Sequence, residues 1–138
     1  MHNLVPGFIT KQLKNGNKFG QFPAVCLFVD LAGYSTMTTA LMELGQHGAE
    51  VLATIMRALF DPMINTIYQY GGFIATFSGD SFTAVFPHSE DQSNLCMNAV
   101  ASALKLQEIV AENRIQTTTI GEFDISIRVG VSDGETSW

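Results

Sequence analysis

The stretch FVDLAGYS, residues 28–35, closes an apolar run and is the starting point for predicting the fold. Residues 24–31 read AVCLFVDL, and Asp30 is the only charged residue among them. A run of this kind is typical of a central strand that is covered on both faces. A carboxylate at the tip of such a strand either caps the following helix or holds a metal ion. The remaining sequence has to distinguish these two roles.

Helices are expected after this strand and again near the end of the chain. The first runs from Gly33 to about Leu44, with Ser35 or Thr36 as its N-cap, because a hydroxyl there accepts from the free N–H groups of the first turn. Apolar side chains then recur at helical spacing over residues 48–70, and the Gly-Gly pair that follows ends this helix. Residues 90–113 return to the same spacing and form the last predicted helix.

Three further strands are predicted. FIATFSGDSFTAVF, residues 73–86, contains two short apolar runs separated by Ser78-Gly79-Asp80. Gly and Asp supply the turn conformations that a hairpin needs. FDISIRVGVS, residues 123–132, alternates between apolar and polar side chains, as a half-buried strand does.

The order of these elements predicts an α+β fold. It is the ferredoxin-like, split βαβ sandwich, β-α-α-β-β-α-β, with an antiparallel or mixed sheet and helices on one face. The third strand is expected between the first and the second, antiparallel to both, and the fourth on the far side of the first. Asp30 ends the first strand and Asp80 begins the third. The two carboxylates are therefore predicted to lie at one edge of the sheet.

Two carboxylates at one edge repel each other unless a cation lies between them. A pair of oxygen ligands suits Mg²⁺ or Mn²⁺ better than zinc. Directly after Asp30, residues 32–35 present free backbone N–H groups at a helix start, which can hold a phosphate without a lysine. Metal and helix start together predict a triphosphate site. In the alternative interpretation, Asp30 only caps the helix and Asp80 only fills a turn.

Composition narrows the class of protein. The chain has 138 residues, the size of one domain, and a formal net charge of −6, which argues against a nucleic-acid partner. No apolar stretch reaches the roughly 20 residues of a membrane span, and the N-terminus lacks the apolar core of a signal peptide. A cytoplasmic location is predicted. Cys26 and Cys96 lie in apolar strand and helix patterns and are predicted to be reduced core thiols.

FVDLAGYS and GGFIATFSGDSFTAVF resemble the catalytic domain of class III adenylyl and guanylyl cyclases. In that family Phe-x-Asp-Ile-x-Gly-Phe-Thr precedes a helical region, then Gly-Gly, a strand and Gly-Asp. The resemblance covers roughly residues 23–134, so the chain is divided into a lead-in, 1–22, and a partial catalytic domain, 23–138. LVPGFITKQL, residues 4–13, is similar to the segment before the cyclase domains of the soluble, bicarbonate-type group.

The resemblance implies a role for each residue of this edge. Asp30 and Asp80 are the two metal-binding aspartates, with the backbone carbonyl of Leu31 as a further ligand. With two Mg²⁺ or Mn²⁺ ions per site, ATP or GTP is converted to a 3′,5′-cyclic nucleotide and pyrophosphate. The residues implied to line the triphosphate follow Leu31 directly: Ala32, Gly33, Tyr34 and Ser35.

The sequence departs from the family pattern in two places. Thr76 stands at a base-contacting position where many adenylyl cyclases have a lysine, so a preference for ATP or for GTP is not carried over. In the family, an Asn and an Arg that stabilise the transition state follow the last strand, whereas this sequence ends at GETSW. A truncated, poorly active chain is therefore expected. Because the family site forms between two domains, a second cyclase domain, in a homodimer or a tandem heterodimer, is the expected partner.

Other interpretations remain open at this point. A catalytically inactive pseudocyclase or regulatory half would bind nucleotide or a partner domain without turnover. A diguanylate cyclase of the GGDEF type shares the core, but the turn at residues 78–81 lacks its second acidic residue. A plain interaction domain is the least specific interpretation. Outside the predicted site, Arg128 is interpreted as an exposed strand residue and His88 as a solvated loop residue.

Overall fold

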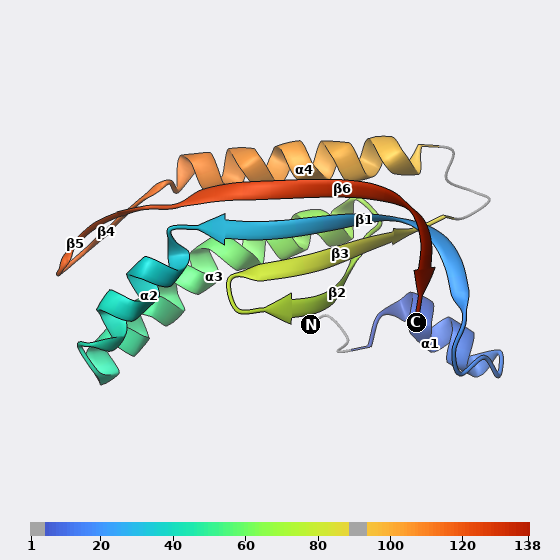
Figure 1. The fold of residues 1–138 in the computed structure, drawn as a ribbon, viewed down its shortest axis with the longest axis horizontal. Coiled ribbons are helices and arrows are strands. Elements are labelled where there is room, and N and C mark those ends of the chain that lie inside the picture. Colours follow the sequence, from blue (N-terminus) through green and yellow to red (C-terminus); the bar gives the residue numbers. More distant parts are fainter. Residues whose placement is uncertain (1–4, 89–93) are drawn as a thin grey trace.

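The computed structural model describes residues 5–88 and 94–138, and Figure 1 shows their arrangement. One four-stranded sheet carries three helices on one of its faces, and a two-stranded ribbon extends beyond one end of it. The helices are α1 (Gly7–Lys14), α2 (Tyr34–Met42), α3 (Gln46–Gln69) and α4 (Leu95–Glu112). The strands are β1 (Gln21–Ala32), β2 (Phe73–Ser78), β3 (Ser81–Pro87), β4 (Ile115–Thr118), β5 (Gly121–Asp124) and β6 (Ser126–Ser137).

The main sheet has the predicted topology. Its strand order is β2-β3-β1-β6, and all three neighbouring pairs are antiparallel. β3 lies between β1 and β2, and β6 lies on the far side of β1, as the split βαβ arrangement requires. The α+β prediction is confirmed. This strand order places the end of β1 beside the start of β3.

The core lies between this sheet and helices α2, α3 and α4. Alternate residues of β1 face the helices, because successive side chains of a strand point to opposite faces. Each of the side chains Val25, Leu27, Val29 and Leu31 is at most 2% exposed. They pack against Met37 and Leu41 of α2, Leu59, Met63 and Ile67 of α3, and Leu106 and Val110 of α4.

The other face of β1 is only partly covered, which corrects the prediction of a strand buried on both sides. Helix α1 covers one end of it, where Phe8 packs beside Ala24 and Phe73. Beyond that contact Phe28 is 56% exposed, although it lies in the middle of a central strand. Part of the apolar run of β1 therefore lies on a face of the sheet that is exposed to solvent. We call the side that carries Phe28 the open face.

The last predicted strand is divided in the structure. Residues up to Asp124 belong to β5, which pairs with β4 in the separate ribbon, and β6 begins at Ser126 and pairs with β1. Ile125, which is fully buried, lies between them. The alternation of side chains continues through this point without a break, so the sequence pattern did not reveal the change of partner strand or the β4–β5 ribbon.

The apolar face of α4 is narrower than predicted. Ala99, Ala103, Leu106 and Val110 are buried, whereas Cys96 is exposed and Val100 is 42% exposed. The prediction of a core thiol is therefore wrong for Cys96. Helix α4 begins at Leu95, and residues 90–93 of the predicted helix lie outside the described part of the chain.

Candidate functional site

The two aspartates of the sequence motifs lie at the same edge of the sheet. Asp30 pairs directly with Ser81, the residue that follows Asp80. The backbone N–H of Leu31 donates to the carbonyl oxygen of Asp80 at 3.1 Å. We call this edge, at the end of β1, the rim. Figure 1 shows that α2 and the turn between β2 and β3 both lie at this end of the sheet.

A side-chain hydrogen bond joins the two motifs at the rim. The hydroxyl of Ser35, in the first turn of α2, donates to Oδ2 of Asp80 at 2.7 Å. Ser35 is therefore not the N-cap, which corrects the sequence prediction for Ser35 and Thr36. Gly33 occupies the N-cap position with φ of +86°, and α2 has no side-chain cap. The hydroxyl that was predicted to cap the helix instead fixes a carboxylate of the neighbouring hairpin.

The residue between Ala32 and Tyr34 must be glycine. A φ of +86° lies in the left-handed region that glycine adopts without strain. A Cβ at Gly33 would also overlap the carbonyl oxygen of Asp124. Since α2 begins directly afterwards, its first N–H groups have no acceptor within the helix and point toward the rim.

Tyr34 directs its side chain into the core. Its side chain is 6% exposed and packs edge-on against Phe60 of α3, with ring centroids 6.2 Å apart. Burial raises the pKa of the Tyr34 phenol, and the nearby charge of Asp80 raises it further. The phenol therefore stays protonated near neutral pH.

The open face carries two rows of residues near the rim. Both rows follow from the strand register, because directly paired residues lie on the same face of a sheet. In the strand order β2, β3, β1 and β6, the row at the rim is Ser78, Ser81, Asp30 and Arg128, and the next row is Thr76, Thr83, Phe28 and Gly130.

Thr76 lies on the same face as Asp30, one row further from the rim. It is exposed, and its hydroxyl makes a long contact of 3.4 Å to the carbonyl of Phe77. A break in the register of β2 between Ile74 and Thr76 places Thr76 opposite Thr83 on the open face. The position predicted to contact the base is thus accessible from solvent.

Arg128 is an exposed residue of β6, as the sequence interpretation expected. It pairs directly with Asp30 across β1 and β6, so a cationic residue lies next to Asp30 on the open face. The alternation of residues 123–132 placed Arg128 on the polar side of its strand. Only the pairing of β6 with β1, in this register, revealed that its neighbour is Asp30.

The donor groups at the rim fit a magnesium-type ion. Within residues 5–88 and 94–138 no cluster of three or more His, Cys, Asp or Glu side chains is arranged for metal binding. The rim offers two carboxylates and backbone oxygens, and Asp30 is partly buried without a hydrogen bond or ion pair in the described structure. Mg²⁺ typically takes one or two carboxylates and completes its shell with substrate phosphates and water. A transition-metal site built on imidazole or thiolate does not fit here.

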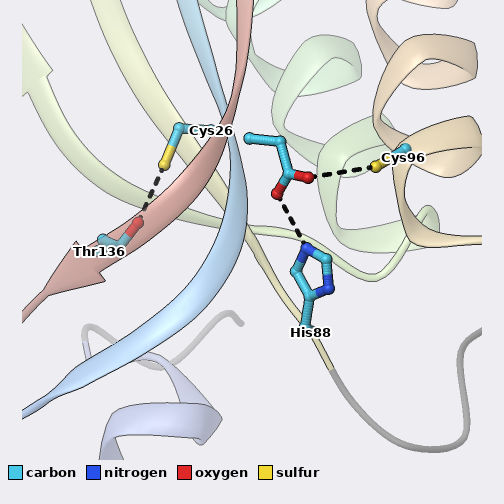
Figure 2. Close-up of polar contacts among 5 residues, drawn as sticks. Cys26, His88, Cys96 and Thr136 are labelled. Carbon is cyan, nitrogen blue, oxygen red and sulfur yellow. Dashed lines mark hydrogen bonds and ion pairs between the residues drawn. The ribbon is translucent and has the colours of Figure 1, made fainter.

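A second polar cluster lies at the other end of β1. Oδ1 of Asp133 is 3.0 Å from Nε2 of His88, and the thiol of Cys96 lies 4.0 Å from Oδ2 of the same carboxylate (Figure 2). Nearby, the Cys26 sulfur lies 3.5 Å from the hydroxyl of Thr136. His88 directly follows β3 and is exposed, in agreement with its interpretation as a solvated loop residue, and the structure adds Asp133 as its partner. We call this end of the sheet the far end.

Comparison with known proteins defines the family. The family model described as "Adenylate and Guanylate cyclase catalytic domain" matches residues 19–137, and the chain belongs to this family. Adenylate cyclase type 10 of Rattus norvegicus is 25% identical over 118 residues, which cover 82% of this chain and 7% of the rat protein. The chain thus spans a small part of that relative.

Solved cyclase structures share the fold. The guanylyl cyclase Cya2 is 25% identical with a TM-score of 0.66, over 86% of this chain and 57% of that one. The adenylyl cyclase CyaB from P. aeruginosa is 20% identical with a TM-score of 0.68, over 87% of this chain and 60% of that one. Among the described helices, none combines the length and apolarity needed to cross a membrane.

Proposed function

We propose that this chain carries the metal-binding part of a purine-nucleotide cyclase site. The proposed reaction converts ATP or GTP to a 3′,5′-cyclic nucleotide and pyrophosphate. The observation that supports it most strongly is the meeting of Asp30, Asp80 and Ser35 at one rim, beside the start of α2. Membership of the cyclase family supports the same reaction class.

Each group at the rim has a proposed task. Asp30 and Asp80, with the carbonyl of Leu31, would hold two Mg²⁺ or Mn²⁺ ions. When bound, such ions activate the ribose 3′-hydroxyl and stabilise the triphosphate and the pyrophosphate leaving group. Ser35 orients the Asp80 carboxylate through its 2.7 Å hydrogen bond. An outer partner of this kind typically tunes metal affinity by 10–100-fold.

The triphosphate would be bound by backbone and by one cation. The N–H groups of residues 32–35 lie at the start of α2, where the helix dipole favours negative charge. The guanidinium of Arg128, across from Asp30, can donate two hydrogen bonds to a phosphate in a fixed geometry. Arg128 would thus supply local positive charge at the rim of a chain that is acidic as a whole, with a formal net charge of −6.

Thr76 would contact the purine base. Its hydroxyl can donate and accept a hydrogen bond but carries no charge. Such a group discriminates weakly between the adenine and guanine edges on its own. ATP and GTP are therefore both substrates to be tested, and the matched relatives include an adenylate cyclase and a guanylyl cyclase.

A second cyclase domain would complete the site across the open face. Phe28 and the polar rows beside it leave an exposed aromatic surface next to the proposed metal ligands. Aromatic residues are enriched in protein interfaces, where a polar rim surrounds the more apolar centre. The partner, in a homodimer or a tandem heterodimer, would supply the base and transition-state groups that Asp30 and Asp80 do not.

Thr76 also favours a second candidate function. In a regulatory half, the chain would bind nucleotide or a partner domain without turnover, because an uncharged base contact at this position serves binding as well as catalysis. The two candidates share the metal–triphosphate site. They differ in whether the assembled protein releases cyclic nucleotide.

Two measurements test these proposals. Calorimetric titration of the chain with Mn²⁺ and a non-cyclising ATP analogue should give saturable heat that Asp30→Ala removes. Glu135→Ala, which removes an exposed acid near the far end of β6, is the matched control and should bind as the wild type does. Absence of heat in the wild-type chain would contradict a metal–triphosphate site. Cyclic nucleotide produced by the full-length protein, and lost in Asp80→Ala, would exclude the regulatory half.

A further inference from the structure

The turn that precedes α2 rests on the base of the β4–β5 ribbon. Gly33 lies so close to the carbonyl oxygen of Asp124, the last residue of β5, that no side chain fits between them. The next residue, Ile125, is fully buried in the core beside β1. The position of the turn therefore depends on where the backbone at Asp124 is held.

Arg114 holds Asp124 in place from outside the ribbon, in addition to the strand pairing of Asp124 with Ile115. Nε and an Nη of Arg114 donate to the two carboxylate oxygens of Asp124 at 2.7 and 2.8 Å. The carbonyl of Arg114 accepts from the N–H of Ile125 at 2.8 Å. The side chain of Arg114 thus binds Asp124 and its backbone binds Ile125, on the two sides of the peptide bond that joins these residues. A bidentate pair fixes the orientation of the carboxylate as well as its distance. We call this arrangement the clasp.

The two side chains of the clasp are exposed, although the backbone that they hold contacts Gly33. Both of its side chains are more than half exposed, at 61% for Arg114 and 53% for Asp124. The hydrogen bond from Arg114 holds the pKa of the Asp124 carboxyl below its ordinary value, so the pair stays charged near neutral pH. Exposed ion pairs contribute little to global stability. Because the pair lies between the ribbon and Gly33, it can affect the position of the turn instead.

We propose that Arg114 and Asp124 are positioning residues for the phosphate-binding turn of residues 32–35. This inference rests on the proposed function, because it assumes that the turn binds the triphosphate. Neither residue touches substrate. The clasp holds the carbonyl of Asp124 against Gly33 and thereby keeps the first N–H groups of α2 aimed at the rim. The ribbon, which extends past the rim in Figure 1, is coupled to the turn through the same contact.

Three variants test the clasp by titration with Mn²⁺ and a non-cyclising nucleotide triphosphate. Asp124→Asn and Arg114→Gln should weaken binding of the triphosphate by about threefold to tenfold, somewhat above the range of an isolated exposed ion pair. Arg114→Lys, which keeps the charge but loses the bidentate geometry, should fall between them and the wild type. Affinity for Mn²⁺ alone, and for the matching nucleoside monophosphate with Mn²⁺, should fall less than affinity for the triphosphate, because Mn²⁺ depends on the turn only through the bond from Ser35 to Asp80.

The control breaks a different exposed ion pair on α4. Lys105 and Glu108 are 2.9 Å apart and comparably exposed, and they lie away from the rim. Glu108→Gln should leave every affinity at the wild-type value. Thermal melting of all four variants checks that each is folded under the conditions of the titration.

The outcomes separate this inference from the function on which it rests. If the wild type binds the triphosphate and the clasp variants bind it equally well, the clasp has no positioning role. If the variants lose affinity for Mn²⁺, monophosphate and triphosphate alike, the effect is general destabilisation and the inference is wrong. If the wild type does not bind the triphosphate at all, the proposed function is wrong, and the inference that rests on it is wrong as well.

Discussion

The two ends of β1 carry polar clusters that are organised in opposite ways. At the far end, Asp133 is paired with His88 and contacted by Cys96, and α1 covers the neighbouring open face. At the rim, Asp30 is partly buried without a hydrogen bond or ion pair in the described residues, and the face beside it is open. A carboxylate that a fold partly buries and leaves unpaired is available for a ligand. The comparison indicates that the polar cluster at the far end has a structural role and that the rim has a ligand-binding role.

The largest effect is expected from replacing the glycine of the turn at the rim, and it is an effect on stability. Gly33→Ala places a side chain in the left-handed region and against the carbonyl of Asp124. We expect a loss of about 1–3 kcal/mol in the free energy of unfolding, as is typical for a strained backbone position. Urea unfolding measures it. Gly134→Ala at the far end is the control, since Gly134 has neither a left-handed φ nor a neighbour within 4 Å of a new Cβ.

Removal of the hydroxyl that orients Asp80 tests the rim without disturbing the fold. Ser35→Ala should lower the affinity for Mn²⁺ by about 10-fold, the usual effect of losing an outer-shell partner of a ligand. Stability should change little, because Ser35 is exposed and its hydrogen bond is not buried. Titration of Mn²⁺ into the two proteins measures this difference. An unchanged Mn²⁺ affinity would mean that Asp80 does not hold the metal.

A matched change at the far end should affect only stability. His88→Ala removes the partner of Asp133, and we expect a loss below about 1 kcal/mol because both side chains are partly exposed. Binding of Mn²⁺ and of the nucleotide analogue should be the same as in the wild type. A fall in nucleotide affinity would show that the two ends of the sheet are not independent, and the comparison drawn above would fail.

The smallest effect concerns the pH dependence of the clasp. The pKa of Asp124 lies below its ordinary value of 3.8 in the folded chain, because Arg114 donates hydrogen bonds to it. A depressed pKa means that the ion pair stabilises the fold above the ordinary pKa and that this contribution is lost as the pH falls through the lower, folded-state pKa. Thermal melting from pH 7 to pH 3 should show a slightly steeper loss below about pH 4 in the wild type than in Asp124→Asn. Parallel curves would contradict this.

Much of the fold could be predicted because local patterns indicate it. The hairpin of β2 and β3 follows from Gly79, whose φ is +61°, and from the apolar runs on either side. The split βαβ order then left one plausible arrangement of strands, which placed Asp30 and Asp80 at one edge. The convergence of two distant carboxylates was thus predictable from residue pattern and handedness alone.

Other features were not predictable from local patterns. The division of the last strand at Ile125 leaves the alternation of side chains intact, so no local signal marks it. Ser35 was predicted to cap its own helix, but the hairpin delivers Asp80 within 2.7 Å of its hydroxyl, and the charge-assisted bond to a carboxylate is stronger than a bond to a neutral N–H group. Arg128 acquires its neighbour only through the register of β6 on β1.

The sequence by itself determined the class of fold, the family to which the chain belongs and the two acidic motifs, because these depend on residue type and on spacing along the chain. Tertiary structure decided which side chains meet: Ser35 with Asp80, Arg128 with Asp30, and Arg114 with the peptide unit that supports Gly33. The physical reason is that contacts between distant segments depend on strand register and on which strand pairs with which. A shift of one residue in the register of β6 on β1 would move Arg128 to the face of the sheet opposite Asp30.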